Sequence, residues 1–407
     1  MKINLRLCSQ NSPLVFLLAL SFAAPVSIAF AQANDEPATE TPAEEASPGE
    51  TQPEATESAP TATEDADPAA TVQEIMQLAY AKTQTAETVA DYEVIINLCS
   101  DGIAKAPDRA AKEYLTKLLA WGYNRRGKAF SEQASGLSDA EEIAALEAKA
   151  LADFEASVKL DPKKWQALHN RGVSYAFTGK LREALADFNA TIKLHPKYPN
   201  VWFNRGEIYY QLGDYTAAVR DYTQATTLSP DDAGALAARG HAYYQLKQYR
   251  NALADYNRAV TMNPDNVAIL TDRGEVYANL GHWQQAATDF RRAVELDATF
   301  GRAYMGAAWT MATCPDERFR DVEAAVTSAE KAIELDGETD WRYLDALAAA
   351  YANASKFDEA QEAITKAIAA APEAQKKNLE SRQGLYTQSK PYRETARTAA
   401  TTTSRSR

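Results

Sequence analysis

One pattern recurs four times at a fixed step of 34 residues, and it constrains the fold more than any other feature of the chain. A period of this length is typical of a repeat array, in which each repeat is one small supersecondary unit. Because one such unit cannot bury its apolar face alone, neighbouring units must stack on one another. The positions that follow the step are Gly172, Gly206, Gly240 and Gly274; Ala184, Ala218, Ala252 and Ala286; Phe188, Tyr222, Tyr256 and Phe290; and Pro162, Pro196, Pro230 and Pro264.

Residues 201–230 predict a pair of antiparallel helices. Trp202, Gly206 and Tyr209 fall at helical spacing, Gly213 lies in the break that follows, and a second helical run carries Ala218. The residues at 206 and 218 lack bulk, so the two helices can approach closely. Glycine inside a helix costs ~1 kcal/mol relative to alanine. Its return in four repeats therefore indicates that close packing outweighs this cost.

The repeat resembles the tetratricopeptide repeat, whose motif places a large residue first, then Leu-Gly, Tyr, Ala, an aromatic residue, Ala and Pro. The resemblance implies an all-α fold, a right-handed superhelical solenoid of about eight antiparallel helix hairpins with a C-terminal capping helix. In residues 201–230 the matching positions are Trp202, Arg205-Gly206, Tyr209, Ala218, Tyr222, Ala225 and Pro230.

Further stretches are similar to a group of secreted bacterial tetratricopeptide-repeat proteins of unassigned activity. This resemblance covers nearly all of residues 72–394, so it supports the fold and implies no particular activity. The stretches are His169-Asn170-Arg171-Gly172, Ala308-Trp309, Ala312-Thr313-Cys314-Pro315, residues 340–351 and Lys390-Pro391-Tyr392-Arg393-Glu394.

The repeats depart from the motif in one recurrent way, because arginine replaces the leucine before the glycine. An aspartate also recurs just before the aromatic residue of the second helix. We hypothesise a ladder of Arg–Asp pairs that links each second helix to a neighbouring first helix; the alternative is that both side chains are solvated. The residues are Arg171, Arg205, Arg239 and Arg273, with Asp187, Asp221, Asp255 and Asp289.

The predicted solenoid extends over residues 71–387. Residues 373–386 are expected to form the capping helix, and residues 388–407 a disordered basic tail rich in Ser and Thr. The regular repeats are 165–196, 199–230, 233–264 and 267–298, and the degenerate or stretched units are 72–107, 108–162, 301–338 and 341–372.

The first 31 residues are typical of a secretory signal peptide, with Lys2 and Arg6 before an apolar run that ends at Ala29-Phe30-Ala31. We expect cleavage after Ala31, export to the periplasm or outside the cell, and no stable membrane insertion afterwards. An uncleaved N-terminal anchor is the alternative. Residues 32–70, rich in Pro, Thr, Ala and acidic residues, predict a disordered linker.

No arrangement of residues points to catalysis, a metal or a cofactor. None of the four histidines pairs with another at metal-ligand spacing, and no phosphate-binding glycine loop is present. The acidic residues at 316, 317 and 321 could hold calcium, although a solvated turn is the simpler interpretation. Cys99 and Cys314 are expected to be buried. The net charge of −13 lies mostly in residues 32–70, so the repeats lack the basic surface of a nucleic-acid binder.

The predicted function is that of a non-enzymatic scaffold. In the resembled family, ligands lie in the concave groove formed by the first helices, and Tyr, Asn and Gln suit peptide recognition. We therefore expect a protein or peptide partner, with inter-helix packing as the alternative role for Tyr210 and Tyr244. A self-associating structural protein is the rival function, and an enzyme is a third class. The candidate groove residues are Asn170, Asn204, Glu207, Tyr210, Gln211, His241, Tyr244, Gln245, Glu275 and Asn279.

Overall fold

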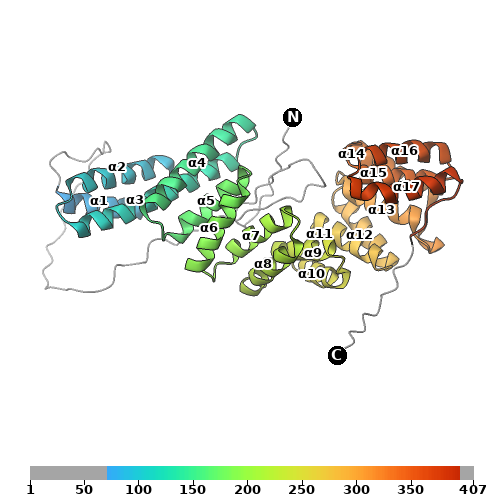
Figure 1. Ribbon diagram of the computed structural model, residues 1–407, viewed down its shortest axis with the longest axis horizontal. Helices are drawn as coiled ribbons and strands as arrows, with labels where there is room; N and C mark the ends of the chain where they lie inside the picture. The colour runs from blue at the N-terminus through green and yellow to red at the C-terminus, as the bar shows by residue number, and fades with distance from the viewer. Residues whose placement is uncertain (1–70, 395–407) are drawn as a thin grey trace, which may run out of the picture. The chain divides into compact units, whose positions relative to one another are not determined.

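The computed structural model describes residues 71–394, and within this range the chain forms seventeen α-helices, one short 3-10 helix and no β-strand (Figure 1). The predicted signal peptide, the acidic linker and residues 395–407 lie outside the described range. Among the described residues, no helix has both the length and the apolar composition needed to span a bilayer. The described chain divides into two compact units, residues 71–208 and 209–394, and the division falls within α7.

The first unit is a stack of helix hairpins in which α1 packs on α2, α3 on α4 and α5 on α6. Its second hairpin is the stretched unit, and the extra residues lengthen both helices, to 27 and 21 residues. The helices are α1 (Val72–Thr83), α2 (Val89–Lys105), α3 (Arg109–Ser135), α4 (Ala140–Leu160), α5 (Trp165–Phe177), α6 (Leu181–Leu194) and α7 (Pro199–Gln211).

The second unit continues the alternation of first and second helices. Its first helices α9, α11, α13 and α15 contact one another in sequence, so they form one continuous wall. The capping helix α17 packs on α16 as predicted (Figure 1). The helices are α8 (Tyr215–Leu228), α9 (Ala233–Gln245), α10 (Tyr249–Met262), α11 (Val267–Asn279), α12 (Trp283–Leu296), α13 (Gly301–Thr313), η1 (Glu317–Phe319), α14 (Val322–Asp336), α15 (Trp341–Asn353), α16 (Phe357–Ala370) and α17 (Glu373–Thr387).

The recurrent helix glycines lie against the buried aromatic ring of their own hairpin. A Cβ atom at Gly172 would lie 2.8 Å from Phe188, one at Gly240 3.0 Å from Tyr256, and one at Gly274 2.9 Å from Phe290. The Phe188 ring is fully buried, so it has no free space into which it could move. The predicted close approach of the two helices is therefore confirmed in these three hairpins.

The Arg–Asp ladder is confirmed within three regular hairpins and in the stretched one. In each case the guanidinium donates two parallel hydrogen bonds of 2.7–2.8 Å to both oxygens of one carboxylate. Arg205 belongs to the first unit and Asp221 to the second, so that pair stays a prediction. The pairs are Arg126–Asp153, Arg171–Asp187, Arg239–Asp255 and Arg273–Asp289.

The same arginines also reach the second helix of the preceding hairpin. Arg239 donates to Thr226 Oγ1 on α8 at 2.8 Å, and Arg273 donates to Asn257 Oδ1 on α10 at 3.2 Å. In the first unit, Arg205 donates to Asn189 Oδ1 on α6 at 2.6 Å. Arg239 and Arg273 therefore each link three helices through hydrogen bonds. The leucine that is usual at this position would make only apolar contacts.

The contact between Gly172 and Phe188 predicts an unusual response to alanine. Helix propensity alone would make Gly172→Ala stabilising by ~1 kcal/mol, but the new Cβ would overlap the buried ring, so we expect the urea midpoint to fall. Gly384 on α17 is the matched control, because a Cβ there would have no neighbour within 4 Å. We expect Gly384→Ala to raise the midpoint. If both substitutions raise it, close packing does not constrain this position.

The ladder predicts strong non-additivity between its two partners. The side chains of Arg239 and Asp255 are only 14% and 6% exposed. Arg239→Leu alone leaves a buried carboxylate without its cation and should lower the free energy of unfolding by ~3–5 kcal/mol, whereas replacing both partners by apolar residues is often nearly neutral. We therefore expect the double variant Arg239→Leu/Asp255→Ala to recover most of that loss in urea unfolding. Small and additive effects would favour the solvated alternative.

Candidate functional site

Three successive first helices of the second unit bring a polar network together on the wall that they form. His241 Nε2 on α9 lies 2.5 Å from Asp272 Oδ2 on α11. Arg302 on α13 forms an ion pair with the same aspartate, and its Nε lies 3.5 Å from Glu275 Oε1. The side chains of His241, Arg302 and Glu275 remain 24–28% exposed. The network therefore presents both donors and acceptors at the surface.

Burial and opposite charges act against each other in this network. Burial raises the pKa of the Glu275 carboxyl, while the positive charges of Arg342 on α15 and His241 oppose the rise. Burial also lowers the pKa of the Arg302 guanidinium. Arg302 Nε has no hydrogen-bond partner among the described residues. This nitrogen is buried, and it lies 3.5 Å from Glu275 Oε1, so it serves the network and not the surface.

The two candidate tyrosines link consecutive first helices. Gln245 donates to the Tyr210 hydroxyl and Asn279 donates to the Tyr244 hydroxyl, each at 3.2 Å. In both pairs the penultimate residue of one first helix meets the last residue of the next. The Tyr210 ring also packs edge-on against Tyr215, with 5.1 Å between centroids. The packing role therefore accounts for both hydroxyls, and each tyrosine is half-buried as a residue. Gln211 is exposed at the end of α7.

The candidates of the first unit are buried, and this corrects the expectation that they line an open groove. Asn170 Nδ2 donates to Asn124 Oδ1 at 3.1 Å, and Asn204 Nδ2 lies 3.0 Å from His169 Nε2. Burial lowers the pKa of His169 to about 4, so the ring is neutral near pH 7. Glu207 is only 3% exposed. Asn170, Asn204 and Glu207 thus offer a ligand no accessible polar group in this structure.

Asp272 and Arg302 complete the network, and neither was among the candidate groove residues predicted from the sequence. Asp272 stands two residues before Gly274, which is the same repeat position as Asn170 and Asn204. That shared position was an available signal for Asp272. Arg302 lies in the first turn of α13, where none of the four regular repeats has an arginine at the matching position. Only α15 has one, Arg342, so the regular 34-residue period does not indicate Arg302.

Other polar groups among residues 71–394 do not converge into a site for chemistry. No three His, Cys, Asp or Glu residues in this range group at metal-binding distance. Asp316, a calcium candidate, pairs with Arg318 at 2.6 Å. Cys99 and Cys314 are buried and free. Burial raises the pKa of Glu147 in the stretched hairpin to about 7, although Ser131 donates a hydrogen bond to it at 3.2 Å.

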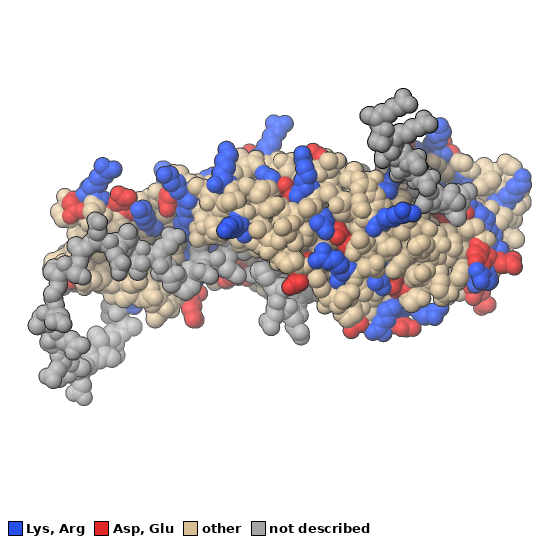
Figure 2. All heavy atoms as spheres, turned by 90° about the horizontal axis from the view of Figure 1, so that it is seen from below, with Lys and Arg blue, Asp and Glu red and all other residues tan. Residues whose placement is uncertain are grey.

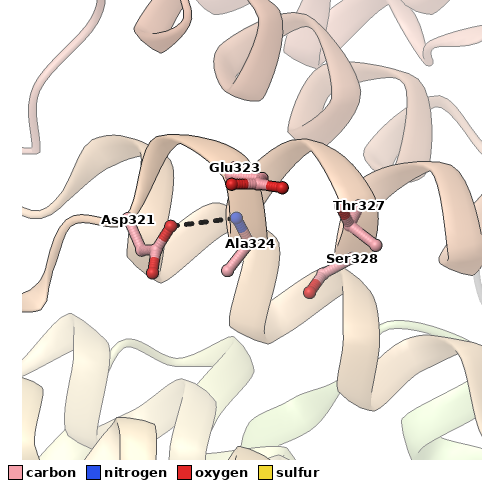
Figure 3. A pocket seen from close by; sticks show the side chains of 5 residues that line it. All are labelled: Asp321, Glu323, Ala324, Thr327 and Ser328. Carbon is pink, nitrogen blue, oxygen red and sulfur yellow. Dashed lines mark hydrogen bonds between the residues drawn. The ribbon is translucent and has the colours of Figure 1, made fainter.

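A hollow lies along α14, and its lining does not form a site (Figure 3). Asp321 already accepts a hydrogen bond from the Ala324 backbone N–H at 2.9 Å, so it serves as the N-cap of this helix. The remaining lining groups, Glu323, Thr327 and Ser328, belong to the same helix.

Basic and acidic side chains are interspersed on the described surface that Figure 2 shows. On that face Lys and Arg are separated from one another by uncharged surface and by Asp and Glu. A nucleic-acid binder would instead gather its basic residues into a stripe or patch.

Comparison with known proteins identifies the repeat. Sequence models described as TPR repeat match residues 177–213, 206–247 and 240–281, and one described as tetratricopeptide repeat matches residues 267–300. No curated protein matches the chain by sequence. These matches include the hairpins that carry the pairs Arg239–Asp255 and Arg273–Asp289.

Several solved structures are similar to this chain at low identity. YrrB, a TPR protein with an unusual peptide-binding site, is 21% identical with a TM-score of 0.40, over 45% of this chain and 92% of that chain. A tetratricopeptide repeat protein from Parabacteroides merdae is 19% identical with a TM-score of 0.47, over 64% and 98%. Yeast Tom70 is 16% identical with a TM-score of 0.39, over 80% and 66%. With its matched repeats and its stacked helix hairpins, the chain is a tetratricopeptide-repeat protein.

Proposed function

We propose that this protein is a non-enzymatic scaffold that binds an extended segment of a protein partner along the wall formed by α9, α11 and α13. The observation that supports this most directly is the network of His241, Asp272, Glu275 and Arg302. It places partly exposed groups from three successive helices on one surface. An extended peptide presents backbone donors and acceptors at regular intervals, and such a surface can meet them.

The chemistry of the wall favours a polar peptide with groups of both charges. Glu275 and Arg302 offer opposite charges close together, and both side chains are partly exposed. The Tyr244 hydroxyl is held by Asn279, so its ring is fixed in place before a ligand arrives. A fixed aromatic surface loses little conformational entropy on binding, which supports affinity without large contact area.

Export is the second part of the proposal, and it rests on the first 31 residues. A charged start, an apolar run and the Ala-Phe-Ala exit are the parts of a cleavable signal peptide. We propose that the mature protein acts outside the cytoplasm and organises a complex of the cell envelope.

The export proposal predicts a defined mature N-terminus. Cleavage after Ala31 would leave Gln32 as the first residue, and N-terminal sequencing of the protein purified from the envelope fraction tests this. A replacement of Ala29 and Ala31 by bulky residues should block processing, because signal peptidase requires small residues there. A native protein that keeps Met1 and sediments with membranes would support the uncleaved anchor instead.

The binding proposal predicts position-specific crosslinking. Gln245 is exposed at the end of a first helix, next to the network, and Gln285 is exposed on the second helix α12. We place a photocrosslinking amino acid at one or the other site and irradiate intact envelopes. Because only the first helices form the proposed wall, the same partner should be captured repeatedly from 245 and not from 285.

Two other outcomes would contradict this assignment. Capture of the same proteins from both positions would mean that the wall is not the binding surface. Crosslinks from 245 to a second copy of the chain would favour the self-associating alternative. Circular dichroism of both labelled proteins controls for folding.

A further inference from the structure

The last described residues form an extended segment that lies on α13 and α15. We call residues 390–394 the C-terminal segment. The chain turns after α17 at Ser389, whose φ is 55°. Glu394 then donates its backbone N–H to the Thr313 carbonyl at 2.9 Å. The prediction of a disordered tail from residue 388 is therefore wrong for this segment, because specific hydrogen bonds hold it.

Arg393 makes the most specific contacts of the segment. Its Nη1 donates to the Ala312 carbonyl on α13, and its Nη2 donates to Asn353 Oδ1 on α15, both at 2.8 Å. Its planar guanidinium fork therefore bridges two neighbouring first helices. A lysine has a single compact ammonium group and could not reproduce this geometry.

Tyr392 packs beside a preformed pair of side chains. Its ring centroid lies 5.9 Å from that of Trp309, and the Arg382 guanidinium carbon lies 5.4 Å from each of these two ring centroids. Arg382 is itself fixed by two hydrogen bonds of 2.9 and 2.7 Å to the buried carboxylate of Asp345. The aromatic site therefore does not depend on Tyr392 for its own rigidity.

The segment occupies repeat positions that belong to the ligand surface proposed above. Ala308 takes the place of the motif glycine in α13, and Trp309, Ala312 and Thr313 follow it at the offsets of His241, Tyr244 and Gln245 after Gly240. The C-terminal segment therefore covers the continuation of the same wall onto α13 and α15.

One buried donor beneath the segment has no partner. In the regular repeats Asn279 Nδ2 donates to the Tyr244 hydroxyl. Asn353 stands at the position of Asn279, but Ala312 stands where the tyrosine would be, and Asn353 Nδ2 is buried with no hydrogen-bond partner among the described residues. The segment thus satisfies the oxygen of this amide and leaves its nitrogen unmet, so it is an incomplete ligand.

We propose that α13, α15 and α17 form a recognition site for an extended peptide with an aromatic residue followed by arginine, and that the C-terminal segment closes this site in the free protein. The inference rests on the proposed peptide-binding function and names a ligand class and its regulation. A segment joined to its site by a short linker competes at an effective concentration of about millimolar. Only a peptide that makes additional contacts would displace it.

Fluorescence anisotropy with a labelled peptide tests the proposal. The probe is the chain's own sequence Ser-Lys-Pro-Tyr-Arg-Glu-Thr, residues 389–395, and the control peptide carries alanine in place of Tyr and Arg. The mature protein is compared with the variant Tyr392→Ala/Arg393→Ala, which releases the site. We expect the probe to bind the released variant about tenfold or more tightly than the native chain, because closure reduces the competent fraction.

A further variant assigns the binding to the site itself. Asn353→Leu in the released background keeps the side-chain volume and removes the acceptor for arginine, so binding of the probe should fall to that of the control peptide. Equal binding of the probe to native and released proteins would overturn the closure. No binding to the released variant, or unchanged binding after Asn353→Leu, would overturn the recognition site.

Native-state hydrogen exchange covers the case in which the released variant does not fold. In the unmodified protein, a segment that opens as a unit exposes the Glu394 amide far more often than the amides in the middle of α13. Exchange of Glu394 only through global unfolding would show a permanent structural strap and would overturn the proposal. Failure of this proposal leaves the crosslinking result at position 245 unaffected, so the two can be judged separately.

Discussion

The buried Arg–Asp pair is the interaction on which the regular repeats depend. An apolar leucine at this position would tolerate small shifts between helices, but two parallel hydrogen bonds to a carboxylate do not. In Arg239 and Arg273 a third contact reaches the preceding hairpin, so the same side chain sets the register inside one repeat and between two. The first helices, and the groups that they present on the wall, are positioned by this link.

The features that could be predicted from the sequence are those that recur in every regular repeat, and the arginine and aspartate of the ladder are among them. The pairing of Arg171 with Asp187 recurs at one offset in successive repeats, and the glycine and its aromatic partner recur in the same way. A residue that recurs at the same position in several repeats indicates a structural requirement, whereas a residue that occurs once does not. The features that the sequence could not indicate do not recur in this way. Arg302 has no counterpart in the four regular repeats, and the segment at 390–394 lies outside the repeats.

Accessibility was the other quantity that the repeat positions could not predict. Asn204 and Asp272 occupy the same position relative to the motif glycine, and both are buried beside a histidine of the preceding first helix, but only Asp272 also forms an ion pair with an arginine. In the first unit a neutral histidine and two amides satisfy one another. In the second unit an aspartate draws a histidine and an arginine together. Whether a position faces a ligand is decided by the residue on the next helix, which lies about one repeat away in sequence.

In α13, alanine stands at the repeat position that holds Tyr244 in α9, and this difference explains why the C-terminal segment can bind there. Where Tyr210 and Tyr244 each tie one first helix to the next, Ala312 has no hydroxyl to offer. Arg393 makes the link instead, from the Ala312 carbonyl to Asn353. A tyrosine there would be a permanent part of the wall, whereas an arginine on a chain end can leave. A single substitution within the repeat pattern thus converts a fixed contact between helices into one that a competing peptide can replace.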